Sequence, residues 1–305
     1  MDALRTACAE VASRARFVTI DTDAIDGYAR SLPLPEPAAD GAAESPRISE
    51  AEREHRAAFW LTLDAVNFGS GWFPTLLKRD GRSGYHTIAT GLSERFERTG
   101  PWSADELGVI TLEEVARAVG QEPTHELMDL FARSLRDLGA HLTAEHDGRF
   151  AAVADAADGS ATALATRLGT WECFADRSRY DELTIPFLKR AQITAADLDR
   201  AGVARLADLD GLTMFADNLV PHVLRLDGVL HFNAALVHRI EREELITHDS
   251  PEEVEIRACA LHAVELIVAA RPGTSAAMID QLLWTRGGEA RYKAAPRHRS
   301  RCTAY

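Results

Sequence analysis

One segment constrains the fold more than any other: "SPEEVEIRACALHAVELIVAAR", residues 250–271. Ser250 is a preferred N-cap residue, Pro251 suits the first helical position, and two glutamates follow where the helix dipole favours negative charge. Apolar residues then recur at helical spacing. The predicted buried stripe consists of Ile256, Ala260, Ala263, Val264 and Ile267.

Most of the remaining chain also favours helix, because it is rich in Ala, Leu, Arg and Glu. Residues 1–31 are predicted to be helical. Ser49, with Glu52 three residues later, has the pattern of a capping box that opens another helix. Its apolar face is predicted to consist of Phe59, Leu63 and Val66, and to end before Gly69.

The sequence shows no alternation of strands and helices, no fixed-period repeat and no series of strands. We therefore expect a mostly α protein with a single domain over residues 1–305. The N-terminal helices and a variable loop would occupy residues 1–48, and the core with the functional motifs residues 49–305. Within the first part, the Pro- and Ala-rich stretch Pro33–Pro46 is predicted to be an exposed loop.

The net charge of −13 argues against a broad nucleic-acid surface, since binding to polyphosphate depends on Lys and Arg. No stable nucleic-acid complex is expected. Neither a signal peptide nor a membrane-spanning run is evident. The four scattered cysteines suggest reduced thiols, so a cytoplasmic location is predicted. No metal or cofactor motif is present, so neither is expected.

The stretch "GLTMFADNLVPHVLRLDG", residues 211–228, places Asp217 inside an apolar run. Two interpretations are open. Asp is a preferred helix N-cap residue, and caps far outnumber catalytic carboxylates. A carboxylate in partly dry surroundings is costly, however, unless a partner or a chemical task holds it there.

Three further motifs are each ambiguous on their own. Lys189 and Arg190 either form a solvated face or hold a phosphate in a cleft. Asn67 lies in "LDAVNFGSGWFP", which is either a packed aromatic corner or a slot for a planar base. Asp280 and Trp284 share a helical face, which fits a surface Asp with a core Trp equally well.

Taken together, these motifs resemble the queuosine salvage family, whose members are queuosine 5′-monophosphate N-glycosylases that release the base queuine. The blocks that carry the resemblance run from about residue 59 to the C-terminus: "LDAVNFGSGWFP", "LKRAQITAADL", "LTMFADNLVPHVLRLDGVL", "EVEIRACALHAVELI", "IDQLLW" and "HRSRCTAY".

The resemblance implies a helical fold related to the helix-hairpin-helix DNA glycosylases. It makes Asp217 the catalytic carboxylate, with Phe215 against the nucleotide and Asp280 on the base. The family also uses an N-terminal histidine, for which His55 is the nearest candidate. Other candidate substrate-binding residues are Asn67, Asn218, Gln281, Trp284 and Thr285. Eukaryotic relatives have Tyr at the positions of Asn218 and Gln281, and a second Asp at that of Thr285.

The implied reaction needs no cofactor. Cleavage of the C1′–N9 bond develops positive charge on the ribose, which a carboxylate at Asp217 would stabilise or attack. Lys189 and Arg190 are the predicted donors to the 5′-phosphate. Two alternatives stay open: a glycosylase for another modified nucleoside or a DNA base, and a non-catalytic helical module that binds tRNA or protein.

Overall fold

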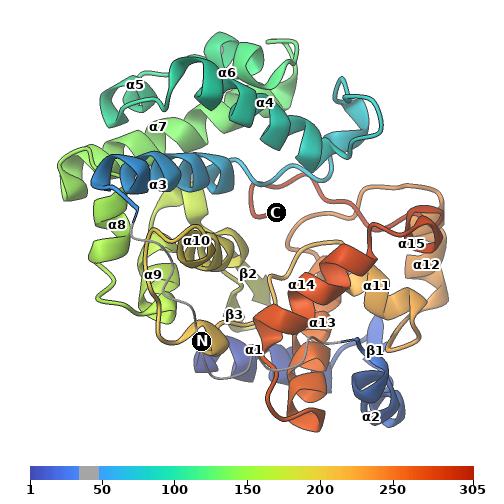
Figure 1. Cartoon of the computed structure of the whole chain (residues 1–305). Coiled ribbons are helices and arrows are strands. Elements are labelled where there is room, and N and C mark those ends of the chain that lie inside the picture. Colours follow the sequence, from blue (N-terminus) through green and yellow to red (C-terminus); the bar gives the residue numbers. More distant parts are fainter. Residues whose placement is uncertain (34–47) are drawn as a thin grey trace.

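The computed structural model describes residues 1–33 and 48–305, which form fifteen α-helices, four short strands and three 3-10 turns (Figure 1). The mostly α class predicted from the sequence is confirmed. The loop predicted over Pro33–Pro46 lies, apart from Pro33, outside the described residues. Within those residues, no helix is long and apolar enough to cross a bilayer.

The helices gather around two apolar cores. The first core is enclosed by the helices at the top and left of Figure 1. They are α3 (Glu50–Ala65), α4 (Gly84–Thr99), α5 (Ala104–Gly108), α6 (Leu112–Val119), α7 (Glu126–His146), α8 (Ala151–Asp155), α9 (Ala161–Leu168) and α10 (Lys189–Arg200), with the 3-10 turns η1 (Phe73–Thr75), η2 (Glu172–Phe174) and η3 (Leu209–Gly211).

The second core combines the two ends of the chain. Its elements are α1 (Asp2–Ser13), β1 (Val18–Ile20), α2 (Thr22–Ser31), β2 (Arg177–Tyr180), β3 (Leu183–Pro186), α11 (Val220–Leu226), β4 (Leu230–Phe232), α12 (Ala234–Glu241), α13 (Pro251–Ala270), α14 (Ala276–Arg286) and α15 (Ala290–Lys293). β1 pairs antiparallel with β4 and β2 with β3, so each sheet is only a two-stranded ribbon.

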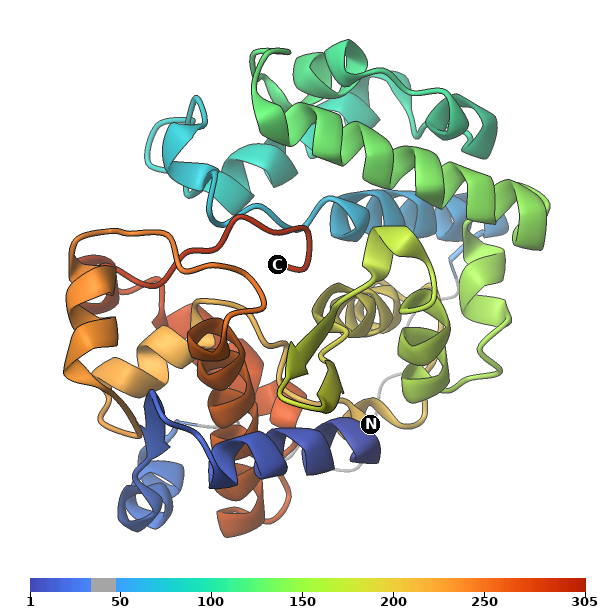
Figure 2. The same ribbon diagram turned by 180° about the vertical axis from the view of Figure 1, so that it is seen from behind.

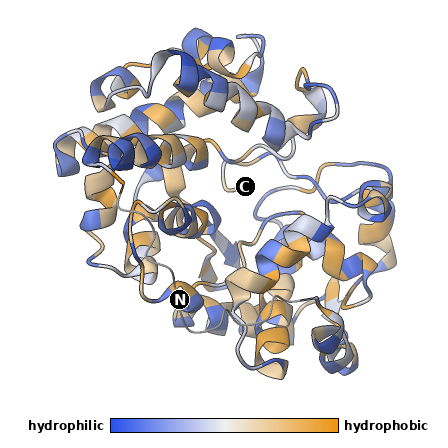
Figure 3. Ribbon diagram, in the orientation of Figure 1, coloured by the Kyte–Doolittle hydropathy of each residue, from blue (hydrophilic) through white to orange (hydrophobic). Residues whose placement is uncertain are grey.

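Helix α13 is the centre of the second core and is largely apolar in Figure 3. Ser250 caps it through the N–H of Glu253, and every residue of the predicted stripe is buried. Over residues 253–261 the other faces are buried as well, which the stripe did not predict. Glu255 is buried because it accepts the N–H groups of residues 16, 17 and 18 at 2.9, 2.6 and 3.1 Å.

The N-terminal region differs in part from the helical prediction over residues 1–31. Helix α1 ends at Ser13, and Val18–Ile20 forms β1 before α2 begins. The strand exists because its partner, β4, supplies the pairing from more than two hundred residues away. Ser49 does cap α3 through the N–H of Glu52, as predicted.

The C-terminal tail runs between the two cores, and the chain end lies near the middle of the molecule in both views (Figures 1 and 2). The Arg299 carbonyl accepts the N–H of Ile246 at 2.9 Å, on the side of the second core. The Tyr305 carbonyl accepts the N–H of Gly69 at 3.0 Å, on the side of the first. The tail therefore ties the end of α3 to the segment that precedes α13.

Candidate functional site

Asp217 lies in the loop between η3 and α11, where the two cores meet. Its Oδ1 accepts the N–H groups of Leu219 at 2.7 Å and Val220 at 3.2 Å. The N-cap residue of α11 is Leu219, however, so Asp217 is not the N-cap that the sequence also allowed. The side chain is half-buried between the buried residues Ala216 and Val220. Oδ2 accepts no hydrogen bond from the described residues, which leaves one oxygen available to a ligand.

The loop around Asp217 is held by hydrogen bonds to two other segments. Buried Arg257 of α13 donates Nε–H to the carbonyl of Ala216 at 2.9 Å. Asn218, itself buried, donates from Nδ2 to the carbonyl of His298 in the C-terminal tail at 3.0 Å. The loop is therefore fixed on both sides of the carboxylate, as a preorganised catalytic group requires. This position makes Asn218 a tether of the loop.

Asp280 of α14 meets the same loop. Its Oδ1 accepts the N–H of Phe215 at 2.9 Å, and the residue is only 4% exposed. Burial, reinforced by the negative charge of Asp217, raises the pKa of the Asp280 carboxyl well above its usual range. Phe215, whose N–H binds Asp280, lies two positions before Asp217, so the two carboxylates belong to one site.

Lys189, the first residue of α10, brings a cation to this site. It is 5% exposed, and its Nζ donates to the carbonyl of Asn67 at 3.2 Å. Burial lowers the pKa of the Lys189 ammonium, whereas the nearby carboxylates, Asp217 foremost, act in the opposite direction. Of the predicted residues, the structure thus brings Lys189 and Asn67 together with Asp217.

Arg190 points elsewhere, although it is the next residue along the helix. It is 1% exposed and donates to the carbonyl of Ala65 at 2.8 Å and to that of Cys173. Its guanidinium also lies over the rings of Phe68 and Phe174, with 4.9 and 5.8 Å to the ring centroids. This environment favours a structural role for Arg190 over contact with a phosphate.

Helix α14 presents Trp284 one turn beyond Asp280. The Trp284 ring is half-buried and lies edge-on to Tyr85 of α4, with 6.2 Å between the centroids, and 6.0 Å from the ring of His86. Gln281 and Thr285 occupy the neighbouring, exposed face of α14, where the Thr285 hydroxyl donates to the Gln281 carbonyl at 2.8 Å.

The sequence did not single out Tyr85 or His86 as site residues. His55, the histidine considered from the sequence, is exposed on α3 and lies edge-on to Phe96 at 6.0 Å. His86 is therefore the histidine that accompanies Trp284. Burial, with help from Arg82 and Lys293, lowers its pKa, so the neutral imidazole is favoured.

Two further charged residues near the site were also missed. Arg297 precedes His298, whose carbonyl binds Asn218, and burial lowers its pKa although the charge of Asp217 opposes the shift. Asp64, in the last turn of α3, is 0% exposed. Burial raises its pKa to about 7, and the charge of Lys189 opposes that shift most strongly. Asp64 stands among apolar neighbours in "TLDAV", the same signal that drew attention to Asp217.

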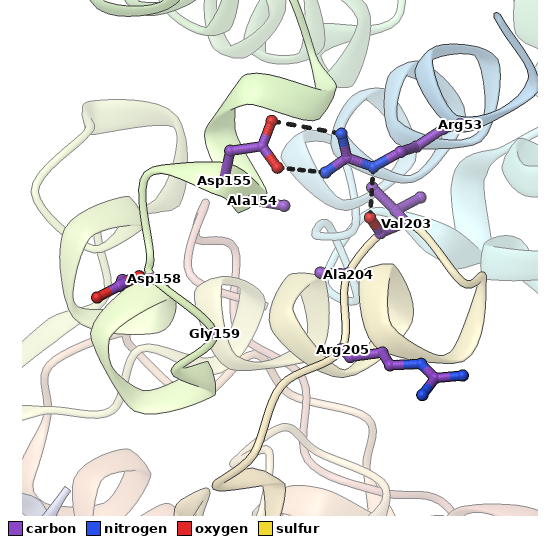
Figure 4. Close-up of a pocket in the computed structure, with 8 residues that line it drawn as sticks. All are labelled: Arg53, Ala154, Asp155, Asp158, Gly159, Val203, Ala204 and Arg205. Carbon is purple, nitrogen blue, oxygen red and sulfur yellow. Dashed lines mark hydrogen bonds and ion pairs between the residues drawn. The ribbon is translucent and has the colours of Figure 1, made fainter. Parts of the chain in front are cut away.

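Figure 4 shows a hollow of about 330 Å³ that lies apart from these residues, beside α3, α8 and the segment after α10. In it Arg53 donates to the carbonyl of Val203 at 2.7 Å and pairs with Asp155. Its lining includes none of the site residues described above. Among residues 1–33 and 48–305, no group of three or more His, Cys, Asp or Glu side chains is arranged to hold a metal ion.

The helical fold brings carboxylates, buried cations and aromatic rings together where the two cores meet. Residues 47–305 match the family model described as queuosine salvage protein, so the chain belongs to that family. The resemblance found in the sequence is confirmed.

Several relatives bear the name queuosine 5′-phosphate N-glycosylase/hydrolase. The one from Sphaerobacter thermophilus is 36% identical over 266 residues, which covers 83% of this chain and 82% of the relative. The one from Bos taurus is 28% identical over 81% of this chain and 78% of the relative. The one from Mus musculus is 27% identical over 97% of this chain and 96% of the relative.

Proposed function

We propose that this chain hydrolyses the N-glycosidic bond of queuosine 5′-monophosphate and releases queuine, with Asp217 as the catalytic carboxylate. The observation that carries the proposal is the placement of Asp217 in a member of this family. One oxygen is fixed by two backbone N–H groups, and the other accepts no hydrogen bond from the described residues. The charge of Asp217 also raises the pKa of Lys189 against the effect of burial.

In this reaction the C1′–N9 bond breaks and its electron pair leaves with the base. The ribose becomes an oxocarbenium ion, which the Oδ2 side of Asp217 stabilises or traps. A water molecule then adds its oxygen to C1′, while its proton passes to the carboxylate and the base takes up a proton. Queuine is a 7-deazaguanine without the N7 that acid catalysis protonates in a purine. Stabilisation of the sugar cation therefore carries most of the rate enhancement.

Asp280 and the aromatic residues suit the base. A carboxylate buried without a cation is costly, and a bound cation or donor-rich ring edge removes that cost. Queuine offers both, namely the amine on its cyclopentenediol arm and its guanine-like edge. Phe215, whose N–H binds Asp280, would then lie against the nucleotide, and Trp284 and Tyr85 would flank the ring. Gln281 and Thr285 would contact the cyclopentenediol arm from the exposed face of α14.

The 5′-phosphate requires cationic donors near Asp217. Lys189 meets this requirement, as predicted from the sequence, and Arg297 replaces Arg190 as its partner in the proposal. The Arg297 guanidinium donates to no acceptor within the described residues, whereas that of Arg190 is engaged by backbone carbonyls. We also propose that the fold is related to that of the helix-hairpin-helix DNA glycosylases. Residues 1–305 form a single domain in this proposal.

The test is incubation of the purified chain with queuosine 5′-monophosphate, followed by mass detection of queuine and ribose 5-phosphate. Release of both at equal amounts is expected, and far slower release from the nucleoside that lacks the phosphate. Base excision from duplex DNA in place of this release would favour the DNA glycosylase alternative. Salt-sensitive binding of tRNA with no release of base would favour the non-catalytic module.

A further inference from the structure

Asp64 is a buried acidic residue to which the proposed reaction assigns no role. It lies in the last turn of α3 and is 0% exposed. Neither carboxylate oxygen has a partner with hydrogen-bond geometry among the described residues, although the side chains of Asn67 and Thr194 lie near enough to favour the ionised form. A buried carboxylate destabilises the folded state unless another group compensates its charge. The position of Asp64 therefore suggests a functional role.

The backbone connects Asp64 to the site through Asn67. The N–H of Asn67 donates to the carbonyl of Asp64 at 3.2 Å, because the chain turns back on itself where α3 ends. The carbonyl of Asn67 in turn accepts the Nζ of Lys189 at 3.2 Å. The Lys189 ammonium is therefore anchored at the end of α3 that carries Asp64.

The charged groups around Asp64 come from two helices. Helix α10 contributes Lys189 and Arg200, whose charges both favour the ionised carboxylate. It also contributes Arg190, on whose pKa Asp64 has a smaller effect than Cys173 and Asp176 have. Helix α4 contributes Tyr85, whose pKa is raised to about 12 by burial and then by the charge of Asp64. Lys189 thus has three carboxylates near it, those of Asp217, Asp64 and Asp176, and the last of these is paired with Arg257 at 2.7 Å.

We propose that Asp64 is a positioning residue that keeps Lys189 charged and in place while Asp217 reacts. This inference rests on the proposed function. Lys189 is buried, and burial favours its neutral amine. The negative charge of Asp217 is neutralised when the carboxylate pairs with, or bonds to, the developing sugar cation. At that moment Lys189 would lose its main counter-ion at the site. Asp176 is already paired with Arg257, so Asp64 supplies the missing charge.

The proposal explains why an unpartnered acid is tolerated inside the first core. If a charged group serves the reaction but destabilises the fold, removal of its charge should increase the free energy of unfolding. Asp64→Asn removes the charge and preserves the shape of the side chain. The variant should therefore unfold at the same temperature as the unmodified chain or higher, yet catalyse more slowly.

The experiment compares Asp64→Asn with Thr62→Val, a matched control on the same helix. Thr62 is 1% exposed, and its hydroxyl likewise has no partner among the described residues. Thermal unfolding and the pH dependence of kcat/KM on queuosine 5′-monophosphate are measured for each chain. In Asp64→Asn, kcat/KM should fall about tenfold or more. Its alkaline limb should move to lower pH, because Lys189 loses a charge that raises its pKa. Thr62→Val should change neither.

Three results would overturn the inference. One is an Asp64→Asn variant with kcat/KM within about twofold of the unmodified chain. Another is a loss of activity with the alkaline limb unmoved, which would assign Asp64 to packing alone. The third is a comparable loss in Thr62→Val. Failure of the unmodified chain to release queuine is a different outcome, since it would reject the proposed function itself.

Discussion

The N–H of Phe215 donates to Oδ1 of Asp280 across 65 positions of sequence, at 2.9 Å. This bond joins the loop that carries Asp217 to helix α14, which carries Trp284. The residue that would contact the base and the loop that would act on the sugar are therefore mechanically linked. A change at Asp280 should thus affect both binding and the placement of Asp217.

This link gives the first prediction. Asp280→Asn keeps an oxygen that accepts from Phe215 but removes the charge, and Asp280→Ala removes both. We expect kcat/KM to fall by roughly 10- to 100-fold in Asp280→Asn, mainly through KM, as for loss of a charge-assisted hydrogen bond. Asp280→Ala should lose kcat as well. Steady-state kinetics on the monophosphate test this, with Met278→Ala, an exposed position on the same helix, as the control. Equal KM values in all three variants would contradict it.

The second prediction concerns the 5′-phosphate. Arg297→Gln should reduce kcat/KM for the monophosphate by roughly 10-fold or more, and leave the slower reaction of the nucleoside almost unchanged. The ratio of the two substrates is the measurement. Arg299→Gln is the control, because Arg299 lies in the same tail but pairs with Glu243 at 3.3 Å. An unchanged ratio in Arg297→Gln would exclude Arg297 from the phosphate site.

The third prediction concerns stability. Arg257 is wholly buried, pairs with Asp176 at 2.7 Å and lies over the Phe187 ring at 3.9 Å. Arg257→Leu leaves Asp176 as an unpaired buried charge, which costs about 3–5 kcal/mol in the free energy of unfolding. Denaturant unfolding measures this cost. Arg242→Gln, which breaks an exposed pair with Glu244, should cost less than about 1 kcal/mol. Similar costs for both variants would contradict the prediction.

The fourth prediction follows from two buried histidines. Burial lowers the pKa of His222 to about 4 and that of His298 to about 3, from an ordinary value near 6.5. Between these values the unfolded chain binds protons that the folded chain does not. The contribution of the two neutral histidines to the free energy of unfolding is therefore fully present above about pH 6.5. It is lost as the pH falls towards 4 and then 3. Melting temperatures measured from pH 7.5 to 4.5 test this. His222→Asn should show a shallower decline, and an identical decline would count against His222.

The sequence predicts those parts of the fold that depend on local signals. Ser49 and Ser250 cap helices where their neighbours indicate, because a cap depends on residues within one turn. The strand at Val18–Ile20 was missed because its three residues are stabilised by a partner near the other end of the chain. Burial of α13 on every face over residues 253–261 was missed for a related reason, since the N-terminal backbone satisfies Glu255.

The site could be predicted only in part. Asp217 and Asp280 were singled out from their sequence surroundings, and the family resemblance implied their roles. The structure brings both residues together with Lys189. Lys189 and Arg190 could not be separated from sequence. Adjacent helical residues point about 100° apart, and only packing decides which one faces the site. Arg297 was missed because its tail reaches Asp217 through tertiary contacts alone.

The most direct test of the central claim is the single-turnover rate of queuine release by Asp217→Asn. The asparagine oxygen can still accept the N–H groups of Leu219 and Val220, so the fold should be kept, with an unchanged melting temperature. Asp210→Asn, in exposed η3, controls for the loss of an acid nearby. We predict a rate at least about 1,000-fold below that of the unmodified chain for Asp217→Asn, and an unchanged rate for Asp210→Asn. A folded Asp217→Asn variant that releases queuine within about tenfold of the unmodified rate would contradict the assignment of Asp217.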